Sequence, residues 1–101
     1  MAADPTDAAD PAAGQSPAVQ AAFARLRSQF LAGLPQRWAE IVSAPPGPLR
    51  AAGLHRLTGA AGSYGLMALG AAARQAELAG GADEALLVVR RQIEAAGVTV
   101  P

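Results

Sequence analysis

Apolar residues recur every three or four positions along most of this chain, which is the spacing of one face of a helix. The first such stripe lies between residues 19 and 34, and it continues through Trp38, Ile41 and Val42 toward Ala44. Strand signals are limited to two short clusters of β-branched residues near the end of the chain. The pattern therefore predicts an all-helical protein. The apolar residues of the first stripe, which we expect to face a core, are Val19, Phe23, Leu26, Phe30 and Leu34.

Start and break signals divide the first half of the chain. Ser16 followed by Pro17 is typical of an N-cap and a first helical residue. Gly33-Leu34-Pro35 predicts a kink or a split, because proline removes a backbone donor and disfavours helix at the residue before it. The sequence leaves open whether residues 17–44 form one kinked helix or two. Pro45-Pro46-Gly47-Pro48 then predicts a turn.

Three more helices are predicted after this turn. The second helix spans residues 48–62 and is followed by a tight break at residues 63–65. The third ends at Gly80-Gly81. The last begins near Asp83, which we expect to cap it, and it closes at Gly97. The residues of these last two helices expected to face inward are Leu66, Leu69, Ala73, Ala76, Leu86, Val89, Ile93 and Ala96.

Short loops between successive helices imply antiparallel neighbours, so we expect one up-and-down antiparallel four-helix bundle over residues 16–97. Residues 1–15 have no large apolar residue after Met1 and are expected to be a disordered tail. Residues 98–101 are expected to be a short, loose C-terminal tail. The aromatic residues expected to supply much of the buried area are Phe23, Phe30, Trp38 and Tyr64.

Composition narrows the possible functions. The chain has no cysteine, which excludes disulfides and thiolate metal ligands. Eight arginines balance eight acids, and the bases are too scattered, with too few aromatic residues beside them, to indicate nucleic-acid binding. The longest uncharged stretch, residues 57–73, is largely Gly, Ala, Ser and Thr, and the acidic N-terminus lacks a secretory pattern. We therefore expect a cytoplasmic monomer that does not enter the membrane.

His55 is the one histidine of the chain and the strongest candidate for chemistry. On a helix it points away from the apolar stripe of Leu54, Leu57, Ala61 and Tyr64. A free imidazole titrates at about pH 6.5, so at neutral pH much of it is an unprotonated nucleophile. The residues expected around the ring are small. We interpret Ala51, Ala52, Gly62 and Ser63 as a docking surface, and we expect Arg56, Thr58 and Gly59 to support the histidine.

The glycines of this segment can be explained in two ways. Glycine inside a helix costs about 1 kcal/mol relative to alanine, so each one needs a reason. A close approach of a neighbouring helix suits Gly53, which borders the core side. Gly59 and Gly62 lie on the histidine side, and clearing space for a partner is the interpretation we favour for them.

Other chemistry is poorly supported. A self-contained hydrolase would need a second histidine or a nearby acid, and the aspartates lie outside this segment. A metal site would need Glu40, Glu77 or Glu94 to converge on His55, and their spacing gives no reason to expect this. We predict no metal and no cofactor.

The run from His55 to Leu69 resembles the histidine box of histidine-containing phosphotransfer (HPt) domains. That family shows His-x-Leu-Lys-Gly-(Ser/Ala)-(Ser/Ala), then a glycine ten residues after the histidine and a leucine four further on. Leu34-Pro35-Gln36-Arg37-Trp38 also resembles the segment that often precedes the box, and the likeness covers roughly residues 19–96. The matching residues of the box are His55, Leu57, Gly59, Ala60, Ala61, Gly65 and Leu69.

The resemblance implies a phosphoryl carrier without turnover of its own. His55 would accept a phosphoryl group from an aspartyl phosphate on the receiver domain of a hybrid sensor kinase or response regulator, and pass it to another receiver. The partner would supply Mg²⁺, an acidic pocket and a lysine. Gly59 would leave the ring accessible.

One residue departs from the family pattern. Thr58 stands where the family usually has lysine, so it offers a hydroxyl in place of a charge, and Arg56 could supply that charge instead. The alternative hypothesis is a helical module that docks receiver domains or other signalling proteins without carrying phosphate.

Overall fold

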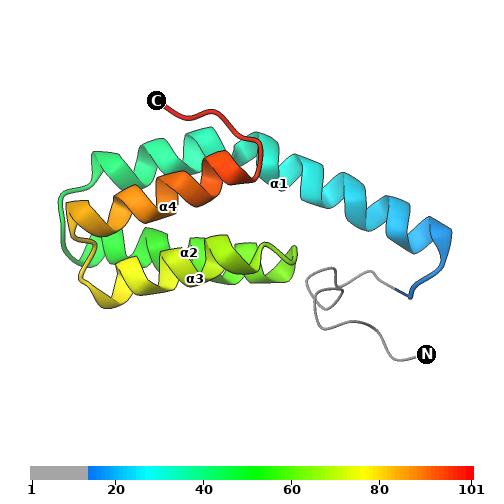
Figure 1. The fold of residues 1–101 in the computed structure, drawn as a ribbon, viewed down its shortest axis with the longest axis horizontal. Coiled ribbons are helices and arrows are strands. Elements are labelled where there is room, and N and C mark those ends of the chain that lie inside the picture. The colour runs from blue at the N-terminus through cyan, green and yellow to red at the C-terminus, as the bar shows by residue number, and fades with distance from the viewer. Residues whose placement is uncertain (1–13) are drawn as a thin grey trace.

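The computed structural model describes residues 14–101, which form four helices in an up-and-down bundle (Figure 1). The helices are α1 (Pro17–Ser43), α2 (Pro48–Ser63), α3 (Met67–Leu78) and α4 (Asp83–Ala95). Short loops connect them, successive helices run antiparallel, and the described residues contain no strand. The predicted all-α four-helix bundle is confirmed. The expected N-terminal tail lies outside the described residues for positions 1–13.

Local signals act at the helix ends as the sequence indicates. The Ser16 hydroxyl accepts a hydrogen bond from the Val19 amide at 3.3 Å, and Pro17 is the first helical residue of α1. At the end of α2 the Leu66 amide donates to the Ala61 carbonyl at 2.9 Å, while Gly65 turns the chain with φ of 74°. This six-to-one bond stops the helix and sends α3 back along α2.

Helix α1 continues as one helix through Pro35, so of the two arrangements that the sequence leaves open, two separate helices do not form. An interior proline costs about 3 kcal/mol, because one helical hydrogen bond is lost and the ring crowds the preceding turn. Leu34, Trp38 and Ile41 are all buried on the same side of α1. Each contributes about 1.5–3 kcal/mol through burial, which together exceeds the cost of the proline.

The first half of α1 corrects the expectation for the apolar stripe. Val19 is 47% exposed and Leu26 is 50% exposed, although both were expected to face a core. In Figure 1 this half of α1 extends beyond the ends of the other three helices, so no core lies beneath it. The stripe is buried only from Leu34 onward.

The aromatic residues divide into one core residue and one partly exposed group. Trp38 is 4% exposed and belongs to the core. Phe30 stacks on Tyr64 with ring centroids 5.0 Å apart, and Phe23 lies 5.8 Å from the same ring. These three rings are only partly buried, so they fasten α1 to the end of α2 rather than filling the core.

Small residues bring α2 and α3 into close contact. A Cβ at Gly70 would lie 3.6 Å from the Thr58 carbonyl oxygen and 3.8 Å from the Ala61 Cβ. Such short approaches leave no room for larger side chains, which explains the alanines at this interface. The buried core residues are Leu34, Trp38, Ile41, Leu54, Leu57, Ala61, Leu69, Ala72, Ala73, Ala76, Leu86, Val89, Ile93 and Val100.

One buried arginine joins the two interhelical loops at one end of the bundle. Arg50, 4% exposed, donates from Nε to the Ala44 carbonyl at 2.8 Å and from Nη1 to the Gly81 carbonyl at 2.9 Å. Its Nη1 also pairs with Asp83 Oδ1 at 2.6 Å. The prediction that Asp83 caps α4 is wrong, because Ala82 occupies the N-cap and Asp83 instead turns to Arg50.

The C-terminal residues are not loose, contrary to the expectation from the sequence. Val100 is 4% exposed and belongs to the core. Its carbonyl accepts a hydrogen bond from Arg90 Nη2 at 3.3 Å. The segment after Gly97 has no regular structure, but the side chains of Val98 and Val100 pack against the core, and the Val98 amide donates to the Ile93 carbonyl at 3.3 Å. Within residues 14–101, no helix combines the length and apolar character needed to span a bilayer.

Candidate functional site

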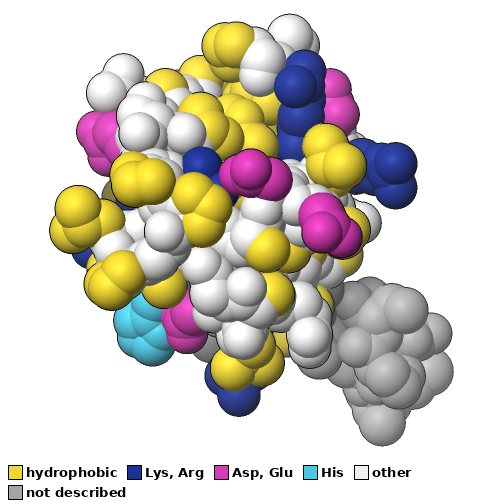
Figure 2. Space-filling view, turned by 90° about the vertical axis from the view of Figure 1, so that its left-hand side faces the viewer, with side chains coloured by type: hydrophobic (Ala, Val, Ile, Leu, Met, Phe, Trp, Pro, Cys, Tyr) yellow, Lys and Arg dark blue, Asp and Glu magenta, His cyan; other side chains and the backbone are white. Residues whose placement is uncertain are grey.

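The imidazole of His55 projects from the outer face of α2, as the helical wheel predicts. Its side chain is 77% exposed, while Leu54 and Leu57 beside it in sequence are fully buried. The histidine, cyan in Figure 2, stands on the surface with an acidic side chain against it. A ring in this position is open to a partner and contributes little to the core.

Glu77 of α3 is the carboxylate beside the ring. Its Oε2 lies 2.9 Å from His55 Nδ1 and its Oε1 lies 3.2 Å away. The Glu77 side chain is 25% exposed, so it is far better anchored than the imidazole that it holds. The pair is a surface contact in which Glu77 belongs to α3 and the His55 ring faces solvent.

This contact follows from the register of α2 against α3. Gly70 of α3 lies opposite Ala61 of α2, since a Cβ on this glycine would be 3.8 Å from the Ala61 Cβ. Moving from there toward the start of α2 and the end of α3 reaches His55 and Glu77, which therefore face each other. The spacing of Glu77 in the sequence gives no reason to expect it near His55, so this contact corrects that expectation. The signal that could have found it is the short Ser63–Gly65 break, which makes α2 and α3 a tight hairpin with a defined register.

The Glu77 contact determines which ring nitrogen is available. An ionised carboxylate only accepts hydrogen bonds, so the proton of a neutral His55 ring lies on Nδ1. The lone pair then lies on Nε2, on the other side of the ring. The arrangement orients the imidazole and leaves Nε2 as its nucleophilic atom.

The space around the ring distinguishes the two interpretations of the glycines. Among residues 14–101, a Cβ at Gly59 or at Gly62 would meet no atom within 4 Å outside its own helix, so no neighbouring helix requires a glycine at either position. A Cβ at Gly53 would lie 3.1 Å from Ile41 Cγ1. Close packing therefore explains Gly53, as expected, while open space surrounds the two glycines on the histidine side.

The remaining residues of the predicted docking surface lie close to the backbone. Ala52 and Ser63 are exposed, and Ala51 is half-buried. The Ser63 hydroxyl donates to the Gly59 carbonyl at 3.0 Å, which keeps its side chain against α2. No large side chain of this set stands between His55 and solvent.

Thr58 and Arg56, the residues expected to support His55, face elsewhere. The Thr58 hydroxyl donates to the Leu54 carbonyl at 2.9 Å, so its hydrogen is already used within α2. Arg56 directs its guanidinium over Gly53 toward α1, whereas His55 meets Glu77 of α3. In this arrangement the charged neighbour of the ring is Glu77.

Within residues 14–101, no group of three or more His, Cys, Asp or Glu side chains could hold a metal ion. His55 and Glu77 are two ligands without a third, which is too few for a structural site.

Comparisons with protein-family models, curated proteins and solved structures give no match. The site is therefore defined by its own geometry: an exposed imidazole, an acid on Nδ1 and a bare surround.

Proposed function

We propose that the protein is a phosphorelay carrier of the HPt kind, with His55 as the phosphoacceptor. The donor would be an aspartyl phosphate on the receiver domain of a response regulator or hybrid sensor kinase in the cytoplasm, and the acceptor another receiver. The protein would act as a monomer and would turn over no substrate of its own. The observation that carries the proposal is the exposed ring with Nε2 open and Nδ1 held by Glu77.

In the proposed step the Nε2 lone pair attacks the phosphorus of the aspartyl phosphate in line with the departing carboxylate. The bond from phosphorus to the aspartate oxygen breaks, and its electron pair leaves with that carboxylate. The Nδ1 proton stays on the ring, which gains positive charge as Nε2 bonds to phosphorus. Glu77 faces this developing charge and stabilises it. Reversal of the step on a second receiver passes the group on.

Transfer of label tests the proposal directly. A panel of receiver domains is charged with a radiolabelled phosphoryl donor and mixed with the protein. We expect label on the wild type that is stable to alkali and labile to acid, as a phosphohistidine should be, and none on His55→Gln. His55→Gln should keep its melting temperature, because exposed substitutions stay within about 0.5 kcal/mol. If His55→Gln became labelled, or if no donor labelled the wild type, the phosphorelay proposal would be wrong. The alternative, a docking module that carries no phosphate, would then remain.

Glu77→Gln is expected to slow acceptance by His55 by about fivefold, which corresponds to ~1 kcal/mol, the upper value for an exposed ion pair. Glutamine keeps an oxygen that can accept from Nδ1, but it removes the negative charge that offsets the ring's developing positive charge. The measurement is the initial rate of label transfer. Glu94→Gln, an exposed change on α4, is the matched control and should leave the rate unchanged. Equal rates for Glu77→Gln and the wild type would show that the carboxylate does not assist the ring.

A further inference from the structure

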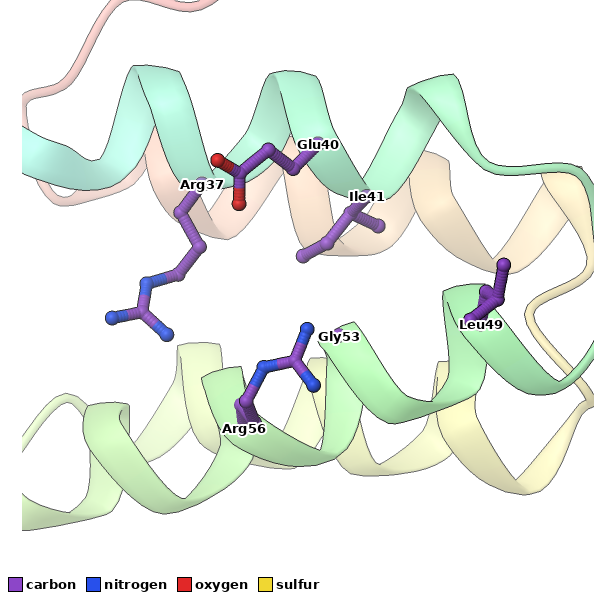
Figure 3. A pocket seen from close by; sticks show the side chains of 6 residues that line it. All are labelled: Arg37, Glu40, Ile41, Leu49, Gly53 and Arg56. Carbon is purple, nitrogen blue, oxygen red and sulfur yellow. The ribbon is translucent and has the colours of Figure 1, made fainter.

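A small pocket opens between α1 and α2, on the side of α2 away from Glu77. Its volume is about 60 Å³. Figure 3 shows the guanidinium of Arg37 reaching from α1 toward α2 and that of Arg56 reaching from α2 toward α1. Two positive groups from different helices thus face the same small space. The lining residues are Arg37, Glu40, Ile41, Leu49, Gly53 and Arg56.

A neighbouring ring holds one of the two guanidinium groups. Arg37 lies over the Phe30 ring, 5.5 Å from its centroid, in a cation–π contact. Arg56 passes over Gly53, where its Nη2 lies 3.8 Å from the place a Cβ would take. The missing side chain at Gly53 therefore makes room for the guanidinium as well as for Ile41 of α1.

The charge of the pocket is unbalanced. Within residues 14–101, the ion pairs involve neither Arg37 nor Arg56. Glu40 lines the same pocket, but its Oε1 accepts a hydrogen bond from Gln36 Nε2 at 3.2 Å. Two arginines against one glutamate leave a single net positive charge. A singly charged carboxylate balances that charge, whereas a phosphate dianion exceeds it.

We propose that this pocket binds the carboxylate of an aspartate or glutamate on the protein that docks over α2. The volume suits one carboxylate group and is far too small for a nucleotide, since one liquid water takes about 30 Å³. Arginine is the side chain best matched to a planar carboxylate, because its donors form a rigid fork. The inference deepens the proposed function, since the docking protein is the phosphoryl donor.

The rim of the pocket adds an apolar requirement. Leu49 lines the pocket and is 77% exposed. A partner that covers the pocket would also cover this side chain and gain its burial. The complementary surface is thus an acidic side chain flanked by an apolar one.

A double variant, Arg37→Gln with Arg56→Gln, tests the pocket in the transfer reaction. The donor is the receiver domain that labels His55 best. We expect the donor concentration at half-maximal rate to rise about tenfold, with the maximal rate unchanged and the salt dependence weakened. Arg91→Gln, an exposed arginine of α4, is the matched control and should change none of these. An unchanged half-maximal concentration in the double variant would overturn the proposal.

Binding of acetate tests the pocket without any transfer. In amide NMR spectra of the full chain, acetate should shift the Gly53 signal in a saturable way in the wild type and not in the double variant. Inorganic phosphate at equal ionic strength should shift it less. A failure of transfer from every donor would overturn the proposed function, and the acetate titration alone would then decide whether the pocket binds carboxylate. If acetate left the Gly53 signal of the wild type unshifted, the proposal that this pocket binds carboxylate would be wrong.

The other possible occupant is the chain's own N-terminal acid. A full-length variant with Asp4, Asp7 and Asp10 each changed to Asn keeps the chain intact and removes those carboxylates. The Gly53 signal without acetate should be the same in this variant and in the wild type. A shift of that signal, with tighter acetate binding in the variant, would assign the pocket to the N-terminal segment and overturn the docking proposal.

Discussion

Replacing Arg50 by methionine is expected to lower the free energy of unfolding by about 2–4 kcal/mol, a large share of the total for a domain of this size. The methylene groups are conserved, but the carbonyls of Ala44 and Gly81 lose their donors at 2.8 and 2.9 Å. Gly81 is buried, so in the Arg50→Met variant water cannot replace the lost donor. The Gly81 carbonyl then remains unpaired, and the variant bears the full desolvation cost of that group. Asp83 is 81% exposed and returns to water, so the ion pair itself contributes little.

Chemical denaturation followed by the fluorescence of Trp38 measures this change, because Trp38 is the single tryptophan and is buried. Arg91→Met is the matched control: it makes the same chemical change at an exposed position and should stay within about 0.5 kcal/mol. A loss below 1 kcal/mol in Arg50→Met would mean that water satisfies both carbonyls. The loops around residues 44 and 81 would then not depend on the arginine.

Gly59→Leu is expected to abolish phosphoryl acceptance while leaving the fold at least as stable as the parent. Leucine is the better helix former by roughly 0.8 kcal/mol, and a Cβ at this position meets no atom within 4 Å. The new side chain leans toward the start of α2 and therefore over His55, between Nε2 and an incoming aspartyl phosphate. Stability and function should thus change in opposite directions in one variant.

The thermal midpoint and the rate of label transfer, measured on the same preparation, separate these effects. Ser28→Leu places an exposed leucine on the first half of α1 and is the matched control for added apolar bulk. It should transfer at the parental rate. Retained transfer in Gly59→Leu would show that the glycine does not clear a docking surface. A marked drop in its midpoint would place position 59 in a helix–helix contact.

Periodicity predicted the four helices and the outward direction of His55 because both depend on local geometry. The apolar stripe of α1 shows where this reasoning fails: Leu26 and Leu34 fit the same spacing, yet one is 50% exposed and the other is fully buried. Spacing defines a face of a helix, but burial requires another helix opposite that face. Whether the stripe of α1 is buried depends on how far α1 extends past its neighbours. The local spacing of apolar residues does not contain the relative lengths of the packed helices.

The partners of the charged residues also could not be predicted from the sequence. Arg50 and Asp83 are separated by 33 positions and meet only because two loops fold to the same end of the bundle. Glu77 reaches His55 through the register of α2 against α3, in which Gly70 lies opposite Ala61. The exposure of His55 and the small residues around it could be predicted, because one helix supplies them all. The contact with Glu77 could not be predicted, because Glu77 belongs to another helix.

The site has a consequence for how this protein can diversify. His55 and Glu77 belong to the single hairpin of α2 and α3 and are 22 positions apart, so the contact between them is made within that hairpin. Helices α1 and α4 carry neither residue of this pair. Substitutions there can change partner preference, or raise and lower stability, without altering the distance between acid and ring. Selection on recognition and selection on chemistry can therefore proceed on separate parts of one small bundle.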